Sequence, residues 1–550
     1  MSKSSEYRDI PVIDSKRVLD RTQFDLSVEG LSDAKRKKAM GDAIDYLKKQ
    51  QETFLGYQVS QDVDYKELSD LLTVSINNVG DPFSAGNYTP NTKFFETAVL
   101  NYYADLWRAK SPHDPKDPES YWGYVLSMGS SEGNIFASWY ARDYLSGKKL
   151  IVNEDEEKIL KEIGLETPKE LTYAHPKKDS RNANAFTPIA FFSEDTHYSV
   201  VKMMLTLKID IFSEIGRCKY PGECPLDEYD AWPNNVPSND EGQIDIDALA
   251  ILVDFFASKG YPIFIVANYG STFKGAYDDV EQIGKRILPI LKKYNLKDRE
   301  IFYDDTDAFS SDVRTGYWIH VDAALGGSYI PFIEKAHNEG LTDAKAPIFD
   351  FRLPFVHSIS TSGHKWPGAP WATGLIMTKV KYQVIPPSDP EYIGSGDTTF
   401  AGSRNGTSAA ILWDFFAKNS HQDLMKKALR CEEVAAYTEK RLKELGKNIG
   451  QDLFVARSPL SLTIRFKRPS EAIIFKYSLS CETLCEHSKV RGYAHLFVMN
   501  HVSKELIDRL IDDLSTEGAF PEQSEEPCSK KIEKDICSGP ALPVHNRGFE

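Results

Sequence analysis

Lys365 occupies a segment whose composition suits covalent chemistry at an amine. It is the single lysine of residues 360–368, which read Ser-Thr-Ser-Gly-His-Lys-Trp-Pro-Gly and follow a β-like run. A lysine held in place among glycine, tryptophan and proline is suited to forming a Schiff base, because its surroundings can favour the neutral amine. An ordinary surface lysine would also fit this segment, so other residues must indicate whether Lys365 is a reactive lysine.

A carboxylate and an imidazole supply two further groups. Asp322 directly follows the β-rich run 317–321, which predicts a place at the carboxyl end of a strand, the ligand side of an α/β sheet. A buried carboxylate needs a partner, and the protonated nitrogen of a pyridine cofactor would be one. His197 is suited to stacking on such a flat ring. A turn-capping aspartate and a structural histidine are the plainer interpretations of these two residues.

Residues 127–134, Ser-Met-Gly-Ser-Ser-Glu-Gly-Asn, run into a helical pattern that ends near Gly147. Free backbone N–H groups at a helix start, together with hydroxyls and small glycines, can bind a phosphate. A serine-rich helix cap is the plainer interpretation. The lysine that follows such a loop in nucleotide-triphosphate sites is missing, so that ligand class is disfavoured.

These groups require a scaffold, and residues 96–400 alternate helical patterns with short β-rich runs. The alternation predicts a mostly parallel sheet with crossover helices, hence an α/β fold. One unit is clear: Asp247 precedes a helical pattern over 248–258, Gly260 ends it, and a strand follows over 262–267. Later, a helical stretch over 408–445 precedes a strand over 461–466 and a last helix after Ser503.

The chain therefore divides into regions of different character. An N-terminal arm with a helical run from Asp33 to Tyr57 precedes the large domain, in which residues 208–247 form an insertion with ten acidic and three basic residues. A smaller α+β domain and a tail of linker-like composition follow. The predicted limits are 1–95 for the arm, 96–400 for the large domain, 401–518 for the small domain and 519–550 for the tail.

Composition limits the function classes. The 550 residues carry a net charge of −15, which disfavours a general nucleic-acid surface or an anchor on an anionic membrane. No apolar run approaches the roughly 18 residues of a membrane span, and the N-terminus lacks the apolar region of a secretory signal. We expect a cytoplasmic protein. Its seven cysteines show no zinc-ligand spacing, so no metal is expected.

Across residues 75 to 515, motifs in a fixed order give the chain a specific resemblance. It resembles the group II pyridoxal-phosphate-dependent amino acid decarboxylases, and within them the branch of histidine, serine, valine and methionine decarboxylases. The motifs are Asn78-Val-Gly-Asp-Pro-Phe, Asn87-Tyr, Gly129-Ser-Ser-Glu-Gly-Asn, His197-Tyr-Ser-Val, Gly270-Ser-Thr-Phe-Lys-Gly-Ala, His320-Val-Asp-Ala-Ala, Ser362-Gly-His-Lys, Asp397-Thr-Thr and Gly402-Ser-Arg-Asn-Gly.

The resemblance implies a fold-type-I architecture, similar to aspartate aminotransferase, and a homodimer with active sites at the subunit interface. It implies that Lys365 forms the Schiff base with pyridoxal 5'-phosphate, Asp322 pairs with the ring nitrogen and His197 stacks on the ring. The other cofactor-binding positions are Gly129, Ser130, Ser131, Thr272, Ala324, Ser362 and His364. The positions implied for the substrate pocket are Asn87, Tyr88, Tyr392 and Ser403, with Arg404 beside them.

The implied reaction releases carbon dioxide and a primary amine from an L-amino acid. In its length and in the run Tyr121-Trp-Gly-Tyr-Val-Leu-Ser-Met-Gly, the chain resembles the valine and methionine decarboxylase subgroup. This resemblance implies a neutral aliphatic or thioether substrate such as methionine, valine or leucine. Histidine, serine and aromatic amino acids follow as candidate substrates.

Three competing functions fit the same family resemblance less well. The first is decarboxylation with deamination, which forms an aldehyde. The second is transamination, which Leu325 disfavours because many aminotransferases have tyrosine at that position. The third is an inactive interaction protein, which would be expected to lose Lys365 or Asp322, and both are present.

Overall fold

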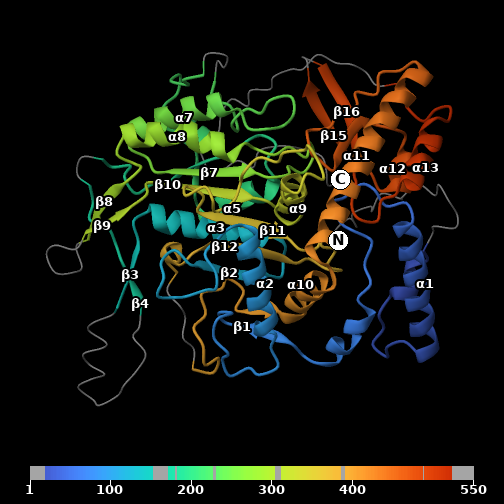
Figure 1. The fold of residues 1–550 in the computed structure, drawn as a ribbon, viewed down its shortest axis with the longest axis horizontal. Coiled ribbons are helices and arrows are strands. Elements are labelled where there is room, and N and C mark those ends of the chain that lie inside the picture. The colour runs from blue at the N-terminus through green and yellow to red at the C-terminus, as the bar shows by residue number, and fades with distance from the viewer. Residues whose placement is uncertain are drawn as a thin grey trace.

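A seven-stranded sheet forms the centre of the structure, a computed structural model that describes residues 19–152, 171–179, 182–226, 231–303, 311–385, 391–486 and 489–522. Within this described sheet, β12 alone runs against its neighbours, and the other strands share one direction (Figure 1). The prediction of a mostly parallel sheet is confirmed. In spatial order the strands are β2 (Tyr121–Leu126), β12 (Gly374–Lys379), β11 (Ser358–Ser362), β10 (Tyr317–Asp322), β7 (Ile263–Asn268), β5 (Ile189–Phe191) and β6 (Asp210–Ile211).

Helices cover this sheet, as the alternating pattern predicts. Helix α3 lies across β10, β11 and β12, and α9 packs on β11. The close approach of α3 depends on Gly133, because a Cβ atom built there would lie 2.6 Å from Cβ of Ser360. The helices of this region are α3 (Ser130–Leu145), α5 (Tyr198–Leu207), α6 (Phe212–Lys219), α7 (Ile246–Ser258), α8 (Val280–Lys293) and α9 (Gly326–Asn338).

The α7–β7 unit matches its sequence pattern, with one difference at the helix start. The cap is Asp245, not Asp247, because the Asp245 carboxylate accepts hydrogen bonds from the backbone N–H groups of Asp247 and Ala248. Gly260 takes a φ of +81° just after the helix. That left-handed conformation suits glycine and turns the chain into β7.

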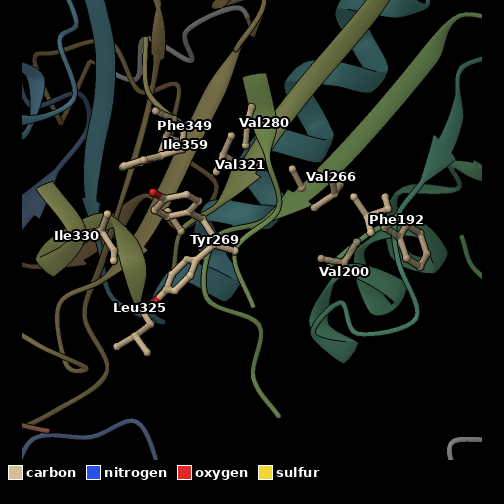
Figure 2. Packing of buried hydrophobic residues seen from close by; sticks show 14 of the residues in the cluster. Phe192, Val200, Val266, Tyr269, Val280, Val321, Leu325, Ile330, Phe349 and Ile359 are labelled. Carbon is tan, nitrogen blue, oxygen red and sulfur yellow. The ribbon is translucent and has the colours of Figure 1, made fainter. Parts of the chain in front are cut away.

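The hydrophobic core runs beneath the strand ends (Figure 2). Val266, Val321 and Ile359 come from β7, β10 and β11 and are almost completely buried. Tyr269 and Leu325 continue this packing just beyond β7 and β10. Tight packing around the strand ends restricts the movement of their carboxyl termini. Polar side chains at these termini are therefore held in fixed positions.

After residue 400 the structure has two helices where the sequence predicted one. Helix α10 (Gly406–Lys418) ends before α11 (His421–Ile449), because Ser420 begins a new helix through a capping box with Asp423. The single helix expected over 408–445 is therefore wrong in its continuity. A three-stranded antiparallel sheet and two helices complete the region: β14 (Thr463–Lys467), β15 (Ser480–Glu486), β16 (Lys489–Phe497), α12 (Glu471–Tyr477) and α13 (Lys504–Leu514).

The N-terminal segment is tied to residues after 400. Its helix α1 (Asp33–Gln51) ends six residues before Tyr57, the expected limit, and lies at the right of Figure 1, below α12 and α13 in that view. Strand β1 (Asn77–Val79) pairs with β13 (Ser403–Asn405), and α2 (Lys93–Leu106) packs on α10. Short helices η2 (Arg21–Phe24) and η3 (Lys66–Thr73) also belong to the N-terminal segment, whereas η4 (Val380–Tyr382) follows β12.

Two antiparallel hairpins lie together at one side of the molecule (Figure 1). The acidic segment 208–247 is partly built into the central sheet, since it supplies β6 and α6, whereas its residues 227–230 lie outside the described chain. Residues 523–550 of the predicted tail also lie outside it. The hairpin strands are β3 (Lys149–Val152), β4 (Leu171–Ala174), β8 (Arg299–Phe302) and β9 (Ser311–Arg314).

Candidate active site

The carboxyl ends of neighbouring parallel strands bring the predicted groups together. The register aligns Asp322 with Asn268 of β7 and Ser360 of β11, and the loop after β11 leads to Lys365. A cavity of about 220 Å³ opens at this edge. Its lining residues are Met128, Ser130, Ser131, Asn134, His197, Ser199, Asn268, Gly270, Ser271, Thr272, Asp322, Ala324, Ser362, His364, Lys365 and Ala372.

Asp322 is buried and surrounded by hydrogen-bond donors. Its Oδ1 accepts from the Ser130 hydroxyl at 3.0 Å and from the backbone N–H of Ala324 at 3.1 Å. Its Oδ2 accepts from the side-chain amide of Asn134 at 2.7 Å. The carboxylate also lines the cavity, where its charge faces the space that a ligand would occupy. A buried carboxylate of this kind favours a cationic ligand group.

Lys365 faces the same cavity in an environment that favours its neutral form. Burial lowers the pKa of the Lys365 ammonium to about 8, and the negative charge of Asp322 acts in the opposite direction. Its Nζ donates a hydrogen bond to Oε1 of Gln58 at 2.5 Å. The amide nitrogen of that buried glutamine has no hydrogen-bond partner among the described atoms. Gln58 therefore has a donor available beside the reactive amine.

His197 lies at the start of α5 and is held by its neighbour. Its Nδ1 is 2.8 Å from the Ser199 hydroxyl and 3.3 Å from the Ser199 backbone nitrogen, which donates to it. Burial lowers the pKa of His197 to about 4, the charge of Lys365 adds to this, and Asp322 opposes it. The imidazole is therefore neutral at pH 7, as a ring that stacks or accepts a proton should be.

The loop before α3 forms the other wall. Gly129 has a φ of +70°, and a Cβ atom there would lie 2.7 Å from the His364 ring. Glu132 fixes the loop, because its Oε2 accepts from the backbone N–H groups of Ser127 and Met128. Ser362 accepts from the Ser130 N–H at 3.0 Å. A helix start, hydroxyls and an imidazole thus converge where an anion would bind.

The four positions expected in the substrate pocket do not line this cavity of the described chain. Asn87 donates its backbone N–H to Ile393 O at 2.6 Å, which joins the N-terminal segment to the one containing Tyr392. Tyr392 is 82% exposed. The Tyr88 hydroxyl donates to Ser75 O, and Ser403 accepts from Asn77.

Arg404, placed beside these positions by the resemblance, is buried instead. It pairs with Glu96 through two contacts of 3.0 and 2.9 Å, and both side chains are at most 1% exposed. The pair ties β13 to α2. Within the described chain, Arg404 thus makes a structural contact and does not line the cavity.

Sequence reasoning missed several residues at the cavity. Gln58 meets Lys365 from 307 positions away, and no local pattern indicates such a contact. Asn134 ends the motif that begins at Gly129, yet its bond to Asp322 was not expected. Ser199 and Asn268 also line the cavity. Polar residues immediately after strand or helix boundaries were the available signal for Asn268 and Ser199.

The donor set fits a phosphorylated pyridine cofactor. The helix start at Ser130 and Ser131 suits a phosphate, Asp322 suits a protonated ring nitrogen, and Lys365 suits a carbonyl carbon. The described residues contain no cluster of three or more potential metal ligands from His, Cys, Asp and Glu.

Comparisons with known proteins agree with this geometry. Residues 166–449 match the model of the pyridoxal-dependent decarboxylase conserved domain. The chain is 27% identical to serine decarboxylase 2 of Oryza sativa subsp. japonica over 88% of this chain and 79% of that protein. It is 29% identical to histidine decarboxylase of Vibrio campbellii over 85% and 92% of the two chains.

A solved structure is more similar still. L-methionine decarboxylase from Streptomyces sp. 590 superimposes with a TM-score of 0.82 and 44% identity, covering 90% of this chain and 98% of that one. The chain therefore belongs to the pyridoxal-dependent decarboxylase family. Its fold is type I, its cofactor is pyridoxal phosphate and it is a carboxy-lyase acting on an amino acid, which confirms the family, fold, cofactor and reaction class predicted from the sequence.

Proposed function

We propose that this enzyme decarboxylates a neutral aliphatic or thioether L-amino acid, with methionine first and valine and leucine behind it. The observation that carries the proposal is the 44% identity to L-methionine decarboxylase over nearly the whole of that chain. The relatives that act on histidine and serine are 27–29% identical, which supports histidine and serine as the second candidates. Because one methylene in a pocket changes discrimination by only about 10- to 200-fold, several of these substrates are expected to react.

The residues around the cavity are assigned the roles that their surroundings support. When bound, the cofactor supplies the electron sink that allows carbon dioxide to leave the α-carbon. Lys365 holds it through the neutral amine that burial favours. Asp322 would pair with the ring nitrogen. Ser131, Thr272 and His364 would hold the phosphate at the start of α3, where the hydroxyl and the N–H of Ser130 are engaged by Asp322 and Ser362. His197 and Ala324 would contact the ring.

His197 and Gln58 are placed to act on the substrate. The backbone N–H of Ser199 donates to Nδ1 of His197, so the neutral ring carries its proton at Nε2. Nε2 is therefore the atom that can donate a hydrogen bond or a proton toward the substrate. Gln58, whose amide nitrogen has no partner among the described residues, donates to the substrate once Lys365 no longer occupies its carbonyl oxygen.

A homodimer completes the site in this proposal. A cavity of about 220 Å³ leaves little space for a substrate side chain beside the cofactor. Asn87, Tyr88, Tyr392 and Ser403 contribute across the subunit boundary. Several large apolar side chains of their region are more than half exposed, which favours an interface there: Leu72, Val74, Phe94, Tyr392 and Phe400.

The dimer is proposed to work in the cytoplasm. No described helix has both the length and the apolar character needed to cross a bilayer. The net charge of −15 gives an anionic surface that is unsuited to binding nucleic acid or anionic lipid.

An amine-product screen tests the substrate proposal. The purified holoenzyme is incubated with each of the twenty amino acids, and carbon dioxide and amine are measured together. We expect the highest kcat/KM for methionine, with equal amounts of the two products and no need for a keto acid. A higher kcat/KM for histidine or serine would overturn the substrate assignment, and aldehyde formation or keto-acid consumption would overturn the reaction.

Matched lysine variants identify the role of Lys365. Lys365→Ala is expected to abolish turnover and the visible absorption band of the bound cofactor. Lys345→Ala, in an exposed loop, is expected to leave both unchanged. Full activity in Lys365→Ala would contradict the assignment.

A further inference from the structure

Asn134 connects the buried carboxylate to a second layer of polar side chains. Its amide nitrogen donates to Oδ2 of Asp322 at 2.7 Å, and its carbonyl oxygen accepts from His320 Nε2 at 3.0 Å and from the Ser360 hydroxyl at 2.9 Å. All four residues are buried. Asn134 thus has donors on one side and an acceptor on the other, which leaves its amide a single orientation.

His320 extends this chain away from the cavity. Its Nε2 faces the Asn134 carbonyl oxygen at 3.0 Å. Its Nδ1 lies 2.9 Å from the Ser358 hydroxyl and 3.2 Å from the Ser358 backbone carbonyl oxygen, and that hydroxyl accepts from Nε1 of Trp318 at 3.0 Å. Burial lowers the pKa of His320 to about 4, so the ring is neutral at pH 7.

Hydrogen bonds thus connect Asp322 to a continuous buried network. Its members, in order from the far end, are Trp318, Ser358, His320, Asn134 and then Asp322. A buried and connected network of this kind fixes the positions of its members, because each side chain is held by its neighbours.

We propose that Asn134 and His320 are positioning residues that hold the carboxylate of Asp322 in its orientation toward the ring nitrogen of the cofactor. Neither side chain needs to react. Without them, the Asp322 carboxylate loses the amide donor that fixes its orientation, and its pairing with the ring nitrogen weakens. This inference rests on the cofactor assigned to the cavity and not on the identity of the amino acid substrate.

The network also reaches His197. The Asn134 amide nitrogen lies 3.4 Å from the Ser199 hydroxyl, which is itself 2.8 Å from Nδ1 of His197. One amide therefore sets the places of two groups on the cavity wall. Changes at Asn134 should accordingly exceed those at His320, which touches only the far side of that amide.

The test compares two cofactors that differ at one atom. Apoenzyme is titrated with pyridoxal phosphate and with its analogue that has a carbon atom in place of the ring nitrogen, and the dissociation constants are measured by absorbance. A correctly oriented Asp322 favours the natural cofactor over the analogue. In Asn134→Ala, which loses a hydrogen bond to the carboxylate, we expect this preference to fall by about tenfold. In His320→Leu, which loses only the bond to Asn134, we expect a smaller fall.

Control variants separate positioning from folding. His357→Leu removes another fully buried histidine of this sheet region, whose bonds go to Ile319 N and Thr315, away from the cavity. It should lower thermal stability and leave the preference unchanged. His320→Gln keeps a donor and should restore part of the preference. Asn134→Asp, which has nearly the same shape, tests the site even if Asn134→Ala does not fold, because a second carboxyl there should nearly abolish the preference.

An unchanged preference would overturn the proposal. If both dissociation constants rise together in His320→Leu and Asn134→Asp, the network supports the fold and not the pairing of Asp322 with the ring nitrogen. The substrate proposal is tested separately by the amine screen, so a failure of one does not imply a failure of the other.

Discussion

Burial of Lys365 predicts an amine that reacts near neutral pH, without any cofactor. With a pKa of about 8, roughly 9% of the side chain is neutral at pH 7. An ordinary lysine with a pKa of about 10.4 is only about 0.04% neutral at that pH. The structure thus predicts an excess of about 200-fold in neutral amine.

The perturbation is Asp322→Asn, which removes the negative charge that raises the pKa of Lys365. The pKa should then fall below about 8, and a fall of one unit would leave about half of the side chain neutral at pH 7. The neutral fraction would rise about fivefold. The predicted increase in Lys365 reactivity is informative, since removal of a catalytic residue normally lowers reactivity.

The assay is reductive alkylation of the apoenzyme with a small aldehyde, followed by peptide mass spectrometry. Labelling of Lys365 should rise with pH to a half-maximum near 8, and at lower pH in Asp322→Asn. A short peptide with one lysine provides the unperturbed reference. Gly41→Ala, which fills open space in α1, is the control variant. A half-maximum near that of the peptide, or an upward shift in Asp322→Asn, would refute the reasoning.

Further predictions concern stability, measured by urea denaturation of the apoenzyme. Removing one partner of the buried Arg404–Glu96 pair should cost about 3–5 kcal/mol, whereas the double variant Arg404→Met/Glu96→Gln should cost less than the sum of the single changes. Gly133→Ala should destabilise by about 1–3 kcal/mol, because its Cβ meets Ser360, whereas Gly41→Ala should be neutral or slightly stabilising. Stability should fall as the pH drops from about 6.5 to 3, because the unfolded chain protonates histidines that the fold keeps neutral. The histidines whose pKa burial lowers in this way are His197, His320, His357 and His495. A urea midpoint that does not change with pH would contradict this prediction.

Much of the fold was readable from local patterns. The strand that ends at Asp322 and the helix–strand unit around Gly260 appear where the sequence predicts them, because capping groups and β-rich runs act over a few residues. The break between α10 and α11 was missed. Its signal, the capping box at Ser420, lies inside a continuous helical pattern and competes with it.

The residues of the site likewise divide into those that a short motif indicates and those that only the fold brings together. Gly129 and Ser130 could be assigned from one short motif, because a helix start that binds phosphate is built within it. The contacts that Gln58 makes with Lys365, and that His320 makes with Asn134, join residues 307 and 186 positions apart. Sheet order and strand register decide such pairs, and neither is written in a local pattern.

The sequence by itself determined which chemical groups this protein has and the cofactor that they serve. Lys365, Asp322 and His197 have side-chain chemistry that few other residues can replace, so their types and order were sufficient. Only the tertiary structure decided their protonation and orientation. Burial lowers the pKa of Lys365, and the hydrogen bonds of Asn134 orient Asp322, because both effects depend on atoms brought together by packing and not by their neighbours in the chain.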